Sequence, residues 1–103
     1  MNHILHVETI LYVQDQVAST LFYSKLFRKK PDLEVPGITE FKINDQFKFG
    51  LMPNYGIQKI LTTMPHPTLG TGIPRCEVYL EVNDIALEFN NALSAGATLI
   101  SGM

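Results

Sequence analysis

The strongest constraint on the fold is a strand-to-helix pattern that occurs twice. The segments Glu8–Asp15 and Glu77–Asp84 align without a gap and share Glu, Leu, Val and Asp at four of eight positions. In each copy, β-branched and apolar residues predict a strand. The closing Asp is suited to be the N-cap of an amphipathic helix that follows. The repeat therefore predicts two units built alike.

The remainder of the first unit predicts one helix and three strands. The helix is expected to begin after Asp15 and to end before Pro31, because proline cannot continue a helix. Strands are expected over 33–35, 38–43 and 47–52, with the turn-forming residues Asn-Asp-Gln between the last two. The apolar face of the helix is predicted to consist of Ala18, Leu21, Phe22 and Leu26.

The second unit is shorter. A connection over 54–75, rich in Pro, Gly and Thr, is expected to contain one helical turn near 57–61. A strand over 76–82 is expected next, and a further strand is expected to begin at 97. The helix between them should carry Ile85, Phe89, Ala92, Leu93 and Gly96 on one face. The prediction is one domain over 1–103, with module one over 1–53, the connection over 54–75 and a partial module two over 76–103.

Composition excludes several classes of protein. The chain has 103 residues, of which 46% are hydrophobic and 17% charged, which is typical of one globular domain. The net charge of −2 provides no basic surplus, so nucleic acid is not expected as a partner. The single Cys76 cannot form an internal disulfide, and the sequence contains no membrane-spanning run or signal peptide. We expect a soluble cytoplasmic protein that does not bind membranes.

Five short stretches occur in an order and spacing that resemble a known superfamily. They are Tyr12-Val13-Gln14-Asp15, Phe22-Tyr23-Ser24-Lys25-Leu26-Phe27, Leu51-Met52-Pro53, Tyr79-Leu80-Glu81-Val82-Asn83-Asp84 and Ala95-Gly96-Ala97. Together with the repeated βαβββ pattern, they resemble the vicinal oxygen chelate superfamily, which includes glyoxalase I, bleomycin-resistance proteins and extradiol dioxygenases. The resemblance implies an α+β fold in which two βαβββ modules form a curved mixed sheet around a concave pocket. The sequence departs from the family at Arg28, where a glycine is usual.

The resemblance also implies that the second module is incomplete. In the family, the last strand of each module lies beside the first, so the strand over 76–82 would lack a neighbour and expose unpaired backbone groups. We therefore expect the sequence to be a fragment, or the ordered portion of a longer chain that continues for about 20–35 residues.

Strand alternation and the resemblance together predict a site on the concave face. Alternate residues of a strand share a face, so Thr9, Leu11 and Val13 should face the helix, as should Val78, Leu80 and Val82. In metal-binding members, a ligand stands seven residues before the Asp of each repeat, where this chain has Glu8 and Glu77. The pocket is expected to contain Glu8, Ile10, Tyr12, Glu77 and Tyr79.

Three interpretations of this pocket remain open. In the first, the pocket binds a small molecule without a cofactor, as bleomycin-resistance proteins do. In the second, Glu8 and Glu77 hold a divalent metal such as Ni, Zn, Mn or Fe, and the protein is a lyase or isomerase of the glyoxalase I (lactoylglutathione lyase) type. In the third, both glutamates are solvated or paired with Arg75 and Lys42. The first is favoured, because Gly50 and Met52 occupy the positions where the third ligand is expected. Whether the protein is an enzyme stays open, and the family implies a homodimer.

Overall fold

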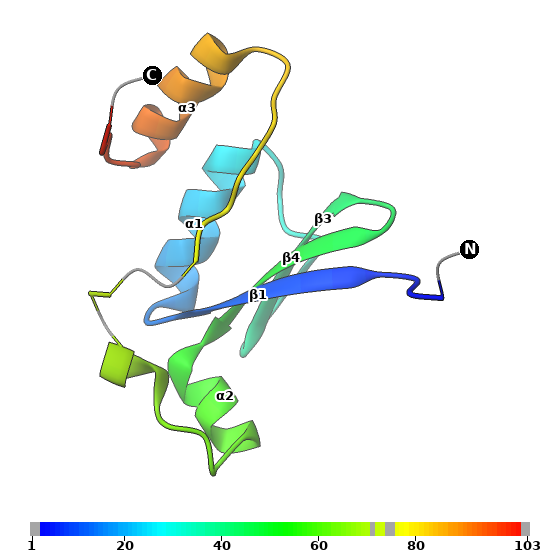
Figure 1. The fold of residues 1–103 in the computed structure, drawn as a ribbon, viewed down its shortest axis with the longest axis vertical. Coiled ribbons are helices and arrows are strands. Elements are labelled where there is room, and N and C mark those ends of the chain that lie inside the picture. Colours follow the sequence, from blue (N-terminus) through cyan, green and yellow to red (C-terminus); the bar gives the residue numbers. More distant parts are fainter. Residues whose placement is uncertain (1–2, 71, 74–75, 102–103) are drawn as a thin grey trace.

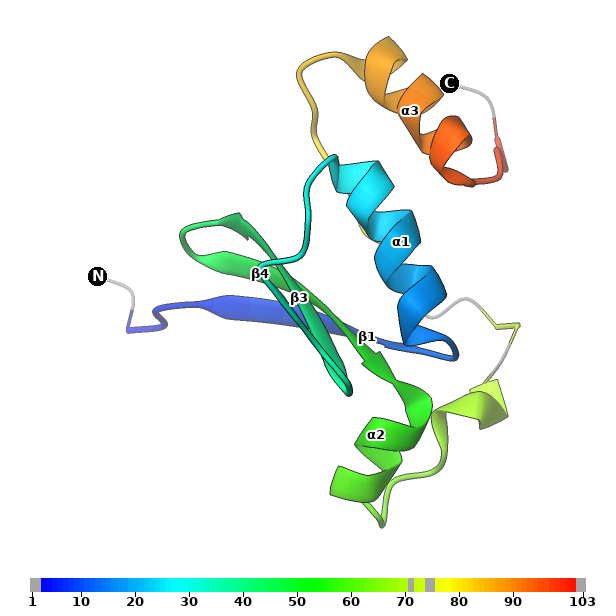
Figure 2. The same ribbon diagram turned by 180° about the vertical axis from the view of Figure 1, so that it is seen from behind.

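The computed structural model describes residues 3–70, 72–73 and 76–101. It is an α+β arrangement in which a helix covers one face of a four-stranded sheet (Figures 1 and 2). A second long helix lies on the first, and a short helix continues from the last strand. The elements are β1 (Val7–Val13), α1 (Gln16–Phe27), β2 (Leu33–Val35), β3 (Ile38–Asn44), β4 (Phe47–Pro53), α2 (Asn54–Ile60), the 3₁₀ turn Pro67–Gly70 and α3 (Ile85–Ala95).

The sheet has the strand order β1-β4-β3-β2. β1 is parallel to β4, whereas β3 is antiparallel to both β4 and β2. A parallel neighbour requires a crossover connection, and α1 with the following hairpin provides it. The three strands predicted after the first helix are therefore confirmed, including the short one at 33–35. This four-stranded unit is the predicted first βαβββ module.

Both aspartates of the repeat cap helices. Asp15 Oδ1 accepts a hydrogen bond from the Ala18 N–H at 3.0 Å, and Asp84 Oδ1 accepts one from the Leu87 N–H at 3.0 Å. The far ends also match, because α1 ends at Arg28 and α3 at Gly96, both left-handed with φ of 54° and 116°. The Arg28 guanidinium pairs with Glu88 of α3. Arginine therefore adopts the backbone conformation that usually favours glycine.

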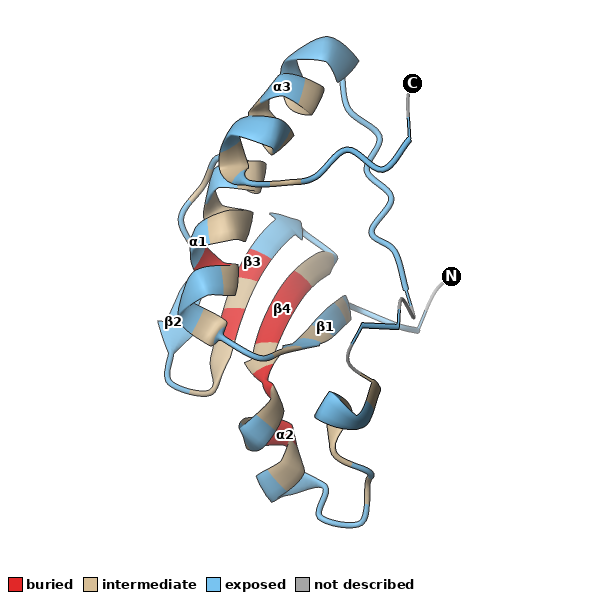
Figure 3. Ribbon diagram, turned by 90° about the vertical axis from the view of Figure 1, so that its left-hand side faces the viewer, coloured by how far each residue is buried: buried red, intermediate tan, exposed pale blue. Residues whose placement is uncertain are grey.

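The core lies between α1 and the sheet and is mostly aromatic. Phe41, Phe49 and Leu51 are buried (Figure 3). Phe27 of α1 packs edge-on against Phe41 and Phe49, with centroids 5.4 and 5.3 Å apart, and Tyr23 lies 4.8 Å from Phe49. Leu11 and Val13 of β1 also pack against this cluster, as alternation predicts for the helix-facing side.

The predicted apolar face of α1 is wrong, because at 3.6 residues per turn it lies almost half a turn from the face that the helix presents to the sheet. Leu21 is 59% exposed, and the residues that face the sheet are Gln16, Thr20, Tyr23 and Phe27. Two of these are polar, and their partners are also polar. The hydroxyls of Thr20 and Thr39 lie 2.9 Å apart, and Gln16 Nε2 donates to Thr39 Oγ1 at 3.0 Å. A search for apolar residues at helical spacing misses a face that begins with an amide and a hydroxyl.

The second unit forms its helix but not its strands. Residues 76–82 and 97–100 belong to no helix or sheet within the described residues, so the strands predicted there are wrong. A strand needs a neighbour to satisfy its backbone groups, and neither segment has one here. α3 forms because its cap is local, and it attaches to α1 through Asn91 Nδ2, which donates to the carbonyls of Lys25 and Leu26 at 3.1 and 3.2 Å. No helix in the described ranges is long and apolar enough to cross a bilayer.

Replacing Phe27 with alanine should lower the free energy of unfolding by about 3–5 kcal/mol, because it removes the ring that joins α1 to two strands. The matched control is Leu21→Ala, on the exposed side of the same helix, which should change it by no more than about 0.5 kcal/mol. Urea denaturation followed by circular dichroism measures both. Equal losses in the two variants would mean that α1 presents a different face to the sheet.

Candidate functional site

The face of the sheet opposite α1 carries a glutamate over a glycine. Glu8 and Ile10 of β1 both lean toward Gly50 of the neighbouring strand β4. A Cβ at position 50 would lie 2.6 Å from Glu8 Oε2 and 3.2 Å from Ile10 Cγ1. The absence of a side chain at Gly50 therefore provides the room that the Glu8 carboxyl occupies. Glu8 and Ile10 share the face opposite Leu11 and Val13, in agreement with the predicted alternation.

Charged residues of β3 and β4 surround Glu8. Glu40 is the cross-strand partner of Gly50, Lys48 is that of Glu8, and Lys48 Nζ lies 3.7 Å from Glu40 Oε1. Glu8 Oε2 is buried and receives no hydrogen bond from any described residue. Burial raises the pKa of Glu8, the neighbouring Glu40 carboxyl raises it further, and the Lys48 ammonium acts in the opposite direction. Glu40 and Lys48 were not predicted as site residues.

A groove runs along the free edge of β1. Its volume is about 750 Å³, and Ile10 and Tyr12 of the predicted pocket lie in its wall. The opposite wall comes from the connection after α2, where His66 Nδ1 lies 2.7 Å from Thr68 Oγ1. The other lining residues are Leu11, Val13, Gln14, Asn54, Pro65, Pro67, Leu69, Gly70, Ile73 and Cys76.

The other two residues of the predicted pocket lie elsewhere. Glu77 and Tyr79 belong to segment 76–82, which forms no helix or strand, and Tyr79 is 80% exposed. In Figure 1 this segment begins near the end of β1 that leads into α1, and it runs past α1 to α3. Glu40 and Lys48, rather than Glu77, are the charged neighbours of Glu8. Glu8 and Ile10 therefore lie together over Gly50, and Ile10 and Tyr12 together line the groove. The structure does not bring Glu77 or Tyr79 to these residues.

The described side chains do not fit a metal centre. Among them, no three His, Cys, Asp or Glu residues lie close enough together to hold an ion. Glu8 has Glu40 as a second carboxyl group, but the Lys48 ammonium beside the pair would repel a divalent cation. The proposed pairing of a site glutamate with Arg75 concerns a residue outside the described ranges. Lys42 is paired with Asp45, 3.6 Å away.

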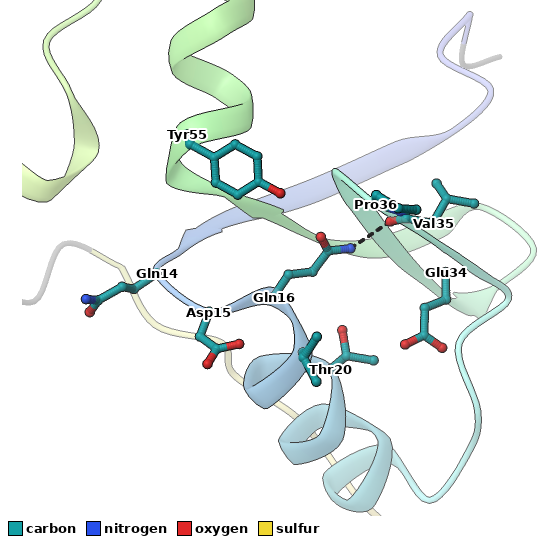
Figure 4. A pocket seen from close by; sticks show the side chains of 9 residues that line it. Gln14, Asp15, Gln16, Thr20, Glu34, Val35, Pro36 and Tyr55 are labelled. Carbon is teal, nitrogen blue, oxygen red and sulfur yellow. Dashed lines mark hydrogen bonds between the residues drawn. The ribbon is translucent and has the colours of Figure 1, made fainter.

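A second hollow, of about 860 Å³, lies at the N-terminus of α1 (Figure 4). Gln16 lies at its centre and joins the helix to the β2–β3 turn. Its Nε2 donates to the Val35 carbonyl at 2.9 Å, and its Oε1 accepts from the Gly37 N–H at 3.0 Å. Both polar groups of the Gln16 side chain are thus hydrogen-bonded within the protein. We therefore interpret Gln16 as a structural link between α1 and the β2–β3 hairpin rather than as a ligand-binding residue.

The fold resembles that of a solved structure. A crystal structure of a glyoxalase-related enzyme from Fulvimarina pelagi superposes with a TM-score of 0.61 at 17% sequence identity, covering 87% of this chain and 63% of the other. The chain thus spans less than two thirds of that protein. No protein-family model matches the sequence, and no curated protein does either. At this identity the likeness shows the fold, which is glyoxalase-like.

Replacing Glu8 with glutamine should stabilise the protein at neutral pH. Because the folded-state pKa of Glu8 is raised, ionisation costs folding stability as the pH rises above the ordinary glutamate value of 4.5. The variant should therefore melt at a higher temperature than the wild type at about pH 7, and the difference should vanish near pH 4. Thermal melts across this range provide the measurement, with Glu34→Gln on an exposed part of β2 as the matched control. A difference that persists at the acidic end would contradict the assignment.

The room above Gly50 can be tested separately. Gly50→Ala places a methyl group where Glu8 Oε2 lies, so the carboxyl must move toward solvent. We expect the pKa of Glu8, followed by carbon NMR of its carboxyl, to fall toward the ordinary value because burial is its largest cause. An unchanged titration in a folded variant would show that Gly50 does not shape this site.

Proposed function

We propose that this chain is a small-molecule-binding protein, related in function to the bleomycin-resistance proteins, that holds its ligand in the groove along β1 without a metal. The observation that supports this most directly is the groove itself. Its volume of about 750 Å³ lies within the range of about 300–1,000 Å³ that is typical of ligand sites.

The lining suggests the class of ligand. The described residues that line the groove include no Asp, Glu, Lys or Arg. Ile10, Leu69 and Ile73 provide apolar contacts, while the Tyr12 hydroxyl and the His66 imidazole provide polar ones. Such a surface favours an apolar, ring-bearing molecule with a few hydrogen-bonding groups. The cationic ligand that a pair of glutamates would attract is not favoured, because Glu8 lies outside this lining.

The alternative function is a metal-dependent lyase or isomerase of the glyoxalase I type. It needs an ion to polarise substrate oxygens, with Glu8 and Glu77 among the ligands. The described residues support it less well, because Lys48 lies beside the carboxyl pair and Glu77 lies on a different segment.

Ligand binding can be tested with the fluorescent probe 1-anilinonaphthalene-8-sulfonate, which has an apolar ring system. When the probe is added, we expect the backbone amide signals of the protein that shift in the NMR spectrum to cluster at 10–14 and 65–73. Tyr12→Ala should weaken its binding about tenfold or more, since burying an aromatic side chain contributes about 1.5–3 kcal/mol. Ile60→Ala, on an exposed part of α2, is the matched control and should not change binding. Shifts confined to the hollow beside α3, near Leu80 and Phe89, would reject the groove as the site.

A calorimetric titration with Ni, Mn, Zn and Mg separates the two functions. We expect no binding at micromolar strength by the folded wild type. Micromolar binding that is lost in both Glu8→Gln and Glu77→Gln would replace the binding function with the lyase alternative.

A further inference from the structure

A histidine in the wall of the groove has one ring nitrogen bonded to the protein and one left over. His66 lines the groove from the connection after α2 and is half-buried. Its Nδ1 accepts a hydrogen bond from the backbone N–H of Thr68 at 3.2 Å, and the Thr68 hydroxyl lies 2.7 Å from the same nitrogen. Among the residues that the structure describes, none forms a hydrogen bond with Nε2 of His66.

The N–H of Thr68 determines which tautomer the imidazole ring adopts. A backbone N–H can donate a hydrogen bond but cannot accept one, so Nδ1 must be the ring nitrogen without a hydrogen. A neutral imidazole then carries its hydrogen on the other nitrogen. The Nε2–H of His66 is therefore a hydrogen-bond donor, and the backbone of the protein itself sets its character.

His66 is held in place by the turn that follows it. Its carbonyl accepts the N–H of Leu69 at 3.0 Å, and its ring accepts the N–H of Thr68. Pro67, the first residue of the 3₁₀ turn Pro67–Gly70, fixes its own backbone φ angle and so limits how the chain leaves His66. Because both the backbone and the ring of His66 are bonded to this turn, the ring loses little further freedom when it binds a ligand.

The other polar side chains of the groove do not discriminate in this way. Tyr12, Gln14 and Asn54 also line it, and a hydroxyl or a carboxamide can either donate or accept a hydrogen bond. His66 can only donate through Nε2 while Thr68 bonds to Nδ1. A ligand that placed a donor against Nε2 would leave both donors unpaired, which is costly once water is excluded, whereas an acceptor would satisfy the ring.

We infer that His66 selects ligands that carry a carbonyl oxygen or a similar hydrogen-bond acceptor on an apolar ring system. The inference rests on the proposed function, because it names the chemical group that the ligand of the groove must carry. The acceptor bonds to Nε2–H at the wall that the connection forms. The ring system then packs against Ile10 and Tyr12 at the wall that β1 forms.

Two probes of the same shape test this selection. In 2-acetylnaphthalene a carbonyl oxygen is attached to the ring system, and in 2-isopropenylnaphthalene a CH₂ group replaces that oxygen. We expect the wild type to bind the ketone about three- to tenfold more tightly, which corresponds to one hydrogen bond between neutral groups. Titration of the backbone amide signals at 10–14 and 65–73 by NMR gives both dissociation constants and the place of binding.

The two probes also separate this inference from the proposed function. Equal affinities of the probes for the groove would overturn the selection by His66 and leave the proposed function standing. If neither probe shifted the signals of the groove, the proposed function would fail, and the selection would fail with it.

A variant separates the donor from the structural role of His66. In His66→Ser a hydroxyl can still accept the N–H of Thr68, but the Nε2–H is gone. Loss of the ring should weaken both probes alike, and the ratio of their affinities should fall to about one. His6→Ser, at an exposed histidine outside the groove lining, is the matched control and should keep the wild-type ratio. A wild-type ratio in His66→Ser would contradict the inference.

The tautomer can be measured in the wild type, without any substitution that affects folding. Long-range proton–nitrogen correlation NMR at about pH 8, where ordinary imidazole is neutral, shows which ring nitrogen carries the hydrogen. We expect it on Nε2 of His66. A hydrogen on Nδ1 would overturn the inference whatever the probes show, because Nε2 would then accept rather than donate.

Discussion

The contact of Phe27 and Tyr23 with the phenylalanines of the sheet is the interaction that holds the first unit together. These rings hold α1 across β3 and β4, which makes that face of the sheet the dry one. Because α1 is the crossover between two parallel neighbours, its position also fixes β1 as the edge strand beside β4. The opposite face is then left for Glu8, Glu40 and Lys48. The position of these three charged residues is thus a consequence of an aromatic contact on the other side of the sheet.

β4 shows how one strand serves two environments. Phe49 and Leu51 are buried against the helix, whereas Lys48 and Gly50 lie on the other face. Gly50 has no side chain, so the space above it passes to its neighbours, and Glu8 occupies it with a carboxyl oxygen that is shielded from water. Burial disfavours the charged form of the carboxyl, and this is the largest cause of the raised pKa of Glu8. A single glycine in the middle of a strand therefore makes room for a carboxyl on another strand, and burial raises the pKa of that carboxyl.

Local features of the sequence predicted more of the fold than non-local ones. The caps at Asp15 and Asp84 were correct, because an N-cap depends on residues only three positions away. The strand over 76–82 was wrong, because alternation can describe a strand but cannot provide its neighbour. Gln16 and Thr20 were missed because their partner, Thr39, lies on a different element. Glu40 and Lys48 were missed for the same reason, since only the register between strands brings them to Glu8. Alternation and the family resemblance predicted a pocket with Ile10 and Tyr12 in it, and both residues line the groove. That the groove binds a ligand stays a prediction. The groove residues on the connection had no periodic signal.

The hydrogen bonds from Asn91 to the carbonyls of Lys25 and Leu26 have a consequence for the way the chain opens. The last carbonyls of a helix lack the full set of partners within it, and here a side chain from α3 provides a donor to two of them. The Lys25 carbonyl also accepts the Arg28 N–H at the C-cap. The final turn of α1 and the middle of α3 therefore stabilise each other. Local opening of either segment breaks these hydrogen bonds, so the two openings are coupled although more than sixty residues separate the segments.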